Sequence, residues 1–243
     1  MFIRAEHMGL VVLTVLSTIP TDAWAQANAN SAITQSVVMK SNYTDGSQFI
    51  SKMCSAADAM DNYSSRFQIS VNKKHPAVTQ SGSLAFRKPR LMRVEVTGGK
   101  NNGALAILQE DGKVHGHAGG ALKMFKTSVS PDSPKVRAPN GLRMVDGDFS
   151  SLANYLRNML NKEKHSRLSS EPIRTDKTTS PTYVLDLYSG KPTHEHLVKR
   201  VYADPGTMLP VFWEDYHHGK LYSESSWSDL KTNVEFPANY FNL

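Results

Sequence analysis

The chain has 243 residues, of which 40% are hydrophobic and 21% are charged, and it carries a formal net charge of +6. This composition is that of an ordinary globular protein, and it excludes collagen-like, low-complexity and wholly disordered chains. The single cysteine, Cys54, excludes an intrachain disulfide and a cysteine-based zinc site. At roughly 100–200 residues per domain, we expect one domain, or at most two small ones.

Residues 1–25 have the features of a secretory signal peptide. Arg4 supplies positive charge, residues 8–16 are apolar, and Ala23-Trp24-Ala25 gives the small-x-small pattern that signal peptidase requires. The apolar stretch is far shorter than the roughly 20 residues that a membrane span needs. We therefore expect cleavage after Ala25 and a soluble protein in a bacterial periplasm; the alternative is an uncleaved amphipathic segment.

The next part of the chain predicts a leader, a helix and a run of strands. Residues 26–44 are predicted to form a loose leader, and a single domain is expected over 45–243. Asp45-Gly46-Ser47 favours a helix start, because apolar residues then recur at spacings of three and four. Strand-like alternation follows, with a hairpin turn at Asp111-Gly112. The predicted strands are 63–71, 79–86, 91–96, 104–109 and 113–116.

The second half of the chain again predicts a helix followed by a run of strands. Residues 126–140 contain three prolines and predict a long loop or lid. Asp148 is expected to cap a second helix, and a polar loop is expected at 166–181. Strands are then predicted at 183–188, 197–203, 209–213 and 221–227. Separate blocks of strands and helices indicate an α+β fold with a curved antiparallel sheet, one face of which the helices cover.

Four segments carry a family resemblance. The first is Gly82-x-Leu84-Ala85-Phe86-Arg87-Lys88-Pro89-Arg90-Leu91-Met92-Arg93, a strand, a basic-proline turn and a second strand. Asp111-Gly112-Lys113, residues 201–211 and residues 222–233 follow it at suitable distances. In this order the segments resemble the LolA/LolB superfamily of periplasmic lipoprotein carriers, and within it an uncharacterised LolA-like family of outer-membrane lipoprotein-sorting-like proteins.

The resemblance implies a fold and a mode of action. The family fold is an open, incomplete β-barrel, with helices as a lid over a hydrophobic cavity that holds acyl chains, and with no cofactor and no catalysis. In LolA the residue before the motif proline is an arginine whose hydrogen bonds hold the lid shut. Here that position is Lys88, the lid-contact candidate, which cannot reproduce a bidentate contact because lysine lacks the planar fork.

Period-two alternation places apolar side chains on one face of the predicted sheet. These side chains are the candidates for the cavity lining, and the alternative is that they pack against the helices in a dry core. With a cavity, the expected function is binding of acyl chains, carrying lipid or lipoprotein in the cell envelope. The candidate lining residues are Phe86, Met92, Val94, Val96, Ile107, Val211 and Trp213.

Two other functions remain open. The fold also resembles the N-terminal half of a periplasmic sensor that engages an anti-sigma factor, which implies a regulatory module with a protein partner. The histidines could instead form a zinc or copper site, because His115-x-His117 and His194-x-His196 each project from one strand face. No acidic cluster or HExxH helix accompanies them, so surface histidines are favoured, and no metal or cofactor is expected.

The basic cluster of Arg87, Lys88, Arg90 and Arg93 raises the question of an acidic partner. Export and the lack of a recognisable motif argue against nucleic acid. Basic residues could instead attract anionic phospholipid headgroups in a transient membrane contact. A solvated basic face is the favoured interpretation.

Overall fold

The computed structural model describes residues 43–44, 46–72, 76–162, 164–191 and 193–243. They belong to one structural unit, Asn42–Leu243. The predicted signal peptide and most of the predicted leader lie outside the described residues. Tyr43–Thr44, at the end of that leader, forms the short strand β1.

Two α-helices form where the sequence predicts them. α2 spans Ser47–Asp58 and α3 spans Phe149–Leu160. The carboxylate of Asp148 accepts a hydrogen bond of 2.9 Å from the backbone N–H of Ser151, which is the expected N-cap of α3. Three short 3-10 turns lie between the helices: η1 (Gly120–Met124), η2 (Pro134–Val136) and η3 (Met144–Asp146).

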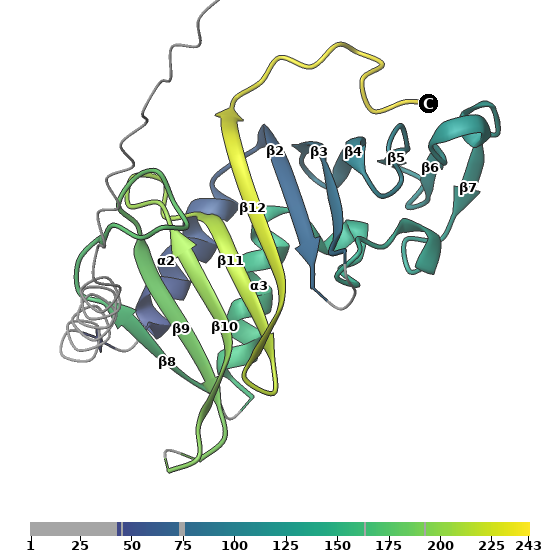
Figure 1. Ribbon diagram of the computed structural model, residues 1–243. Helices are drawn as coiled ribbons and strands as arrows, with labels where there is room; N and C mark the ends of the chain where they lie inside the picture. The colour runs from purple at the N-terminus through teal and green to yellow at the C-terminus, as the bar shows by residue number, and fades with distance from the viewer. Residues whose placement is uncertain (1–42, 45, 73–75, 163, 192) are drawn as a thin grey trace, which may run out of the picture. The chain divides into compact units, whose positions relative to one another are not determined.

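The strands form one twelve-stranded sheet in the order β1-β8-β9-β10-β11-β12-β2-β3-β4-β5-β6-β7, and every neighbouring pair is antiparallel (Figure 1). β12 joins the two halves because it pairs with both β11 and β2. β1 and β7 are the edges, so the curved sheet is not closed into a barrel. The predicted α+β fold with an open antiparallel sheet is confirmed. Besides β1, the strands are β2 (Asn62–Val71), β3 (Val78–Arg87), β4 (Leu91–Gly99), β5 (Leu105–Leu108), β6 (Val114–His117), β7 (Thr127–Val129), β8 (Lys164–Ser169), β9 (Tyr183–Ser189), β10 (His196–Ala203), β11 (Pro210–His217) and β12 (Lys220–Thr232).

The sequence did not predict three of these strands, and all three lie at or next to a sheet edge. β7 falls inside the predicted loop 126–140, and most of β8 falls inside the predicted loop 166–181. β1 and β7 are two and three residues long, and β8 has the polar sequence KHSRLS. Such strands lack the alternation of apolar residues that marks a half-buried strand.

Both helices pack on the half of the sheet that contains β8–β12. Phe49 of α2 contacts Tyr183 of β9, with ring centroids 5.2 Å apart. Phe149 of α3 faces Trp227 of β12 at 6.3 Å, and Tyr155 lies over the buried ammonium of Lys199 in β10. One hydrophobic core therefore fills the space between the helices and this half of the sheet, and it extends to buried side chains of β2–β6 such as Tyr63 and Phe86.

The cap of α3 gives a stability prediction. Asp148 is buried and its carboxylate accepts from both the N–H and the hydroxyl of Ser151. We expect Asp148→Ala to lower the free energy of unfolding by about 1–2 kcal/mol, because an N–H of the first turn loses its acceptor. Urea denaturation would measure this. Asp148→Ser keeps an acceptor and should retain most of the stability; an equal loss in both variants would contradict the assignment.

Candidate functional site

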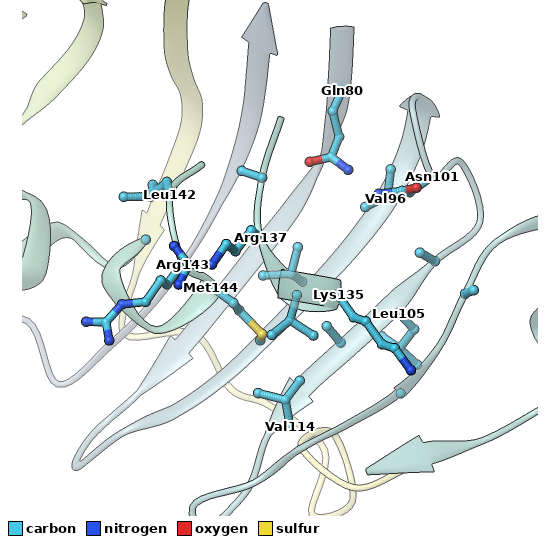
Figure 2. Close-up of a pocket in the computed structure, with 18 of the residues that line it drawn as sticks. Gln80, Val96, Asn101, Leu105, Val114, Lys135, Arg137, Leu142, Arg143 and Met144 are labelled. Atoms are coloured by element: carbon cyan, nitrogen blue, oxygen red, sulfur yellow. The ribbon is translucent and has the colours of Figure 1, made fainter. Parts of the chain in front are cut away.

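A pocket of about 460 Å³ lies on the half of the sheet that the helices leave uncovered (Figure 2). Its floor consists of side chains from β2–β6 and β12. Its cover comes from the lid segment, defined here as residues 126–147, together with η1. The floor residues are mainly apolar: Phe67, Ile69, Leu84, Val94, Val96, Leu105, Ala106, Val114 and Trp227.

Strand register explains why these side chains meet. Directly paired residues of an antiparallel sheet point to the same face. Leu84 pairs with Val94, and Val94 pairs in turn with Ala106, so the three form one row across β3, β4 and β5. Phe67 and Val96 are both paired with Gly82 on the same face. The pocket floor is therefore a continuous apolar surface rather than a set of isolated contacts.

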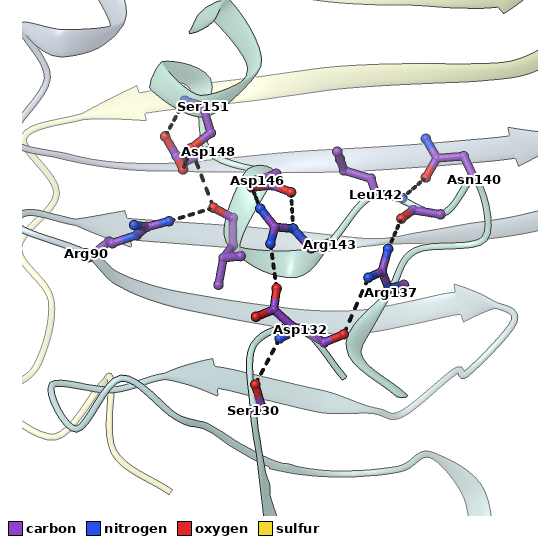
Figure 3. Close-up of polar contacts among 12 residues, drawn as sticks. Arg90, Ser130, Asp132, Arg137, Asn140, Leu142, Arg143, Asp146, Asp148 and Ser151 are labelled. Carbon is purple, nitrogen blue, oxygen red and sulfur yellow. Dashed lines mark hydrogen bonds and ion pairs between the residues drawn. The ribbon is translucent and has the colours of Figure 1, made fainter. Parts of the chain in front are cut away.

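The cover of the pocket is a chain segment without a regular helix. Val136, Leu142 and Met144 line the pocket from above. The segment is held by Arg143, whose Nε and Nη2 donate to the two oxygens of Asp146 at 2.6 and 2.8 Å and whose Nη1 donates to Asp132 at 2.5 Å (Figure 3). The hydrogen bond to Asp146 has the largest effect, followed by that to Asp132, and both raise the pKa of the Arg143 guanidinium above its usual value.

Arg90 provides a link between the lid segment and the sheet. It is the last residue of the β3–β4 turn, and its guanidinium donates to the carbonyl of Val145 at 3.5 Å (Figure 3). Arg143, in contrast, bonds to Asp132 and Asp146 within the lid segment itself. The lid is thus stiffened internally. Its β7 residues are hydrogen-bonded to β6, and the rest of the segment packs on the sheet mainly through apolar side chains.

One side of the pocket is polar. Gln80 is buried, and its amide Nε2 donates to the carbonyl of Lys100 at 3.0 Å. Ser225 is also buried, and its hydroxyl has no hydrogen-bond partner among the described residues. Ile69 pairs with both residues, so Ser225 and Gln80 lie in one row across β12, β2 and β3. The pocket can therefore offer a hydroxyl and an amide to a polar group at the end of an apolar ligand.

The structure divides the sequence-predicted lining residues into four groups. Val94 and Val96 line the pocket. Phe86 and Met92 lie on the same face but are buried in the core, where the Phe86 ring stacks on Tyr63 at 5.2 Å. They support the floor without lining it.

Ile107 lies on the other face of the sheet. It pairs with Arg93, whereas Val94 pairs with Ala106, so the register puts Ala106 on the pocket face. Ile107 is fully buried in a second cluster, under the C-terminal Phe241. Its assignment to the pocket lining is corrected, because alternation within β5 alone does not fix which face turns inward.

Val211 and Trp213 of β11 do not line this pocket. Trp213 is only 2% exposed and packs edge-on against Trp227, with ring centroids 4.9 Å apart. The ammonium of Lys199 lies 3.7 Å from the centroid of the Trp213 ring and pairs with Asp215. For Trp213 the structure therefore shows the alternative interpretation, a side chain packed in the core.

Lys88, the predicted lid contact, contacts α2, one of the two helices, and not the lid segment of residues 126–147. Its ammonium donates to the carbonyl of Asp58, the last residue of α2, at 2.7 Å and to the carboxylate of Asp61 at 2.9 Å. A cation at a helix C-terminus is favourable because it faces the negative end of the helix dipole. Lys88 thus ties the β3–β4 turn to the end of α2.

The other basic residues of the cluster also have partners within the fold. The Arg93 guanidinium forms an ion pair with Glu95 and lies over the Tyr240 ring. The Arg87 guanidinium lies over the Phe241 ring at 4.9 Å. The C-terminal segment therefore covers part of the surface that these side chains form.

The histidines of the two predicted metal-binding pairs contact different groups. His115 pairs with the carboxylate of Asp111 at 2.8 Å, and His117 lines the pocket with its ring near the carbonyl of Ala118. His194 contacts Thr193 and is exposed. Within the described ranges, no group of three or more His, Cys, Asp or Glu side chains is arranged to hold a metal ion.

The sequence predicted a loop or lid over 126–140, but it did not identify the individual lid residues that line the pocket or the polar row. Val136, Leu142 and Met144 follow no helical or strand period, so only their place over the pocket reveals them. Ser225 sits in a strand rich in serine, and nothing distinguishes it from Ser223 or Ser226 in the sequence. Their role depends on contacts between segments far apart in the chain.

Comparison with known proteins finds neither a matching family model nor a matching curated protein. Solved structures do match, at low identity. A LolA superfamily protein from Nitrosomonas europaea is 11% identical, covers 82% of this chain and 98% of its own, and has a TM-score of 0.40. A DUF1329 family protein from Desulfovibrio piger is 14% identical, with coverage of 82% and 98% and a TM-score of 0.40.

A third match is the MucA/MucB complex of Pseudomonas aeruginosa, at 15% identity and a TM-score of 0.48; it covers 82% of this chain and 61% of that one. A LolA superfamily protein is thus among the solved structures that this chain matches. The likeness concerns the fold. In the part of the chain that the structure describes, no helix is long and apolar enough to cross a membrane.

The hydrogen bonds of Arg143 give a prediction for the lid. We expect Arg143→Met to make amide hydrogen exchange in residues 130–147 about two- to fivefold faster, because the segment loses its internal ion pairs. Hydrogen-exchange mass spectrometry would measure this. Arg66→Met is the matched control, since Arg66 forms an exposed ion pair with Asp229 outside the lid segment. Unchanged exchange in the Arg143 variant would show that its ion pairs do not hold the lid.

Proposed function

We propose that this protein binds the acyl chain of a lipid or lipoprotein in the pocket beneath the lid segment, and carries it in the cell envelope. The observation that supports this proposal is the continuous apolar floor of the pocket under a cover that contains no regular helix. Cleavage of the predicted signal peptide would place the protein in the periplasm. The proposed activity is binding and release, without catalysis.

The size and chemistry of the pocket suit such a ligand. A volume of about 460 Å³ falls in the range of small-molecule sites, roughly 300–1,000 Å³. Each methylene that leaves water contributes about 0.8 kcal/mol, so an acyl chain can bind without a charged anchor. Ser225 and Gln80 lie where they could bind the carbonyl or carboxyl group at the end of the chain.

The alternative is a module whose ligand is a protein. Such a module would use an apolar groove for side chains of its partner, and it would have no need of a buried hydroxyl beside that groove. The buried Ser225 hydroxyl at the end of the apolar floor favours the acyl chain. The two functions differ in a direct observation, which is whether the purified protein carries a lipid.

Filling the pocket tests the proposal. Ala106 points into the pocket from β5, and we expect Ala106→Phe to reduce acyl-chain binding at least tenfold, because the larger ring occupies the ligand's space. Native mass spectrometry of the protein, purified without detergent and then incubated with a long-chain fatty acid, would measure the bound fraction.

Val211→Phe is the matched control for this experiment. Val211 is half-buried in β11 and lies outside the pocket, so its enlargement should leave binding intact. Lipid binding that is equal in the wild type and the Ala106 variant would contradict this pocket as the site. A protein that never carries lipid would favour the protein-binding alternative.

The polar row gives a second test. We expect Ser225→Ala to weaken fatty-acid binding about fivefold, because one hydrogen bond to the carboxyl group is lost. Ser65→Ala is a close control, since the Ser65 hydroxyl is also buried and without a partner among the described residues but lies outside the pocket. Displacement of a fluorescent fatty acid would measure both. An equal effect of the two substitutions would remove Ser225 from the ligand site.

A further inference from the structure

The chain between β6 and β7 forms an apolar tip on the surface, defined here as residues 120–126. Leu122 is 57% exposed, Met124 88% and Phe125 66%. These are three of the five large hydrophobic side chains that are exposed in the described part of the chain. Single exposed apolar residues are common, but a contiguous group of this kind marks an interaction site.

The backbone holds the base of the tip in place. Gly119 packs against the β4–β5 turn so closely that a Cβ atom there would lie 1.9 Å from the carbonyl oxygen of Asn102. Gly120 has a φ of +64°, which favours glycine. The N–H of Phe125 donates to the carbonyl of Leu122 at 3.1 Å and closes the turn. The apolar side chains are thus presented by a defined turn and not by an extended loop.

Charge decides between the surfaces that could cover this tip. Lys123 and Lys126 alternate with the apolar residues, both are exposed, and no acidic residue occurs among residues 120–126. At a lipid bilayer the apolar side chains can enter the boundary region while the lysine stems extend toward the headgroups. An anionic surface attracts each such lysine. The pattern therefore matches an anionic phospholipid bilayer better than an apolar protein surface, where both ammonium groups would lose water.

The tip is continuous with the pocket. Leu122 and Phe125 also line it, so they form part of its rim, whereas Met124 does not line it and extends away. We propose that the tip docks this protein on an anionic phospholipid bilayer, with Met124 inserted and with the pocket rim against the membrane. An acyl chain could then pass between bilayer and pocket with little exposure to water; this transfer rests on the proposed function, whereas the docking itself does not.

Co-sedimentation with vesicles tests the docking. We expect the protein to bind vesicles of phosphatidylglycerol and phosphatidylcholine, and to bind pure phosphatidylcholine at least tenfold more weakly. Met124→Glu should reduce binding to the mixed vesicles at least tenfold, and Lys123→Gln and Lys126→Gln should each reduce it about fivefold. Met124→Leu and Leu243→Ser are the controls, because one retains an apolar tip and the other alters an exposed apolar residue outside the tip. Binding unaffected by Met124→Glu would overturn the proposal.

A fluorophore locates the contact independently of affinity. Cys54 is the chain's single cysteine, it lies in the core, and burial raises the pKa of its thiol, so a Met124→Cys variant can be labelled selectively. An environment-sensitive label at position 124 should shift to the blue on anionic vesicles, and lipid-borne nitroxides should quench it. No shift would overturn insertion. A shift on concentrating the protein without lipid, with dimers in sedimentation velocity, would assign the tip to a second copy instead.

The outcomes separate this proposal from the proposed function. Met124→Glu should still take up a fatty acid added in solution, because Met124 does not line the pocket. Vesicle binding by a protein that takes up no fatty acid would leave the docking intact and overturn the pocket's function. Fatty-acid uptake with no vesicle binding would leave the pocket's function intact and overturn the docking.

Discussion

The structure depends on a mismatch between the width of the sheet and the size of the helices that cover it. Twelve strands at about 4.8 Å spacing extend roughly 50 Å across the sheet. The two helices have twelve residues each, so each is roughly 18 Å long and about 10 Å wide. They cover β8–β12, and the core that they form reaches Tyr63, Phe86 and Met92 of β2–β4, but they leave the pocket floor on β3–β6 uncovered. This apolar face must either be covered by another segment of the same chain or hold a ligand.

The lid segment meets this need only partly. A segment with prolines and short 3-10 turns cannot align a row of side chains as a helix does, so it covers the sheet without filling the space beneath it. Val136, Leu142 and Met144 touch the ligand space from above, while Arg143 joins the two ends of the segment to each other. Within this cover β7 is hydrogen-bonded to β6, whereas the part beyond β7 is stiff in itself and rests mainly on apolar contacts, so that part can move away from the sheet as one piece. This is a suitable arrangement for a ligand that must enter and leave.

Much of the fold could be predicted from the sequence, and the reasons are local. The spacing of apolar residues after Ser47 and the cap at Asp148 are contained within single helices, and the central strands show clear alternation. β1, β7 and β8 could not be predicted because short or polar strands near an edge need no apolar face. The face that Ile107 occupies could not be predicted either, since alternation within β5 predicts which residues share a face but not which face lies toward the pocket. The register with β4 decides that, and the register is a property of two strands together.

The site likewise has features that one segment predicts and features that depend on pairing between segments. Val94 and Val96 could be found because β4 alternates regularly, but the buried hydroxyl of Ser225 becomes meaningful only when β12, the last strand of the chain, pairs with β2. The pocket is thus completed where β12, late in the sequence, pairs with β2, early in the sequence, in the interior of the sheet. The exposed tip of residues 120–126 has the opposite origin, since its apolar side chains are adjacent in sequence and visible without any tertiary contact. Apolar side chains in a loop carry no periodic signal, and they acquire significance only when the fold leaves them uncovered beside an apolar pocket.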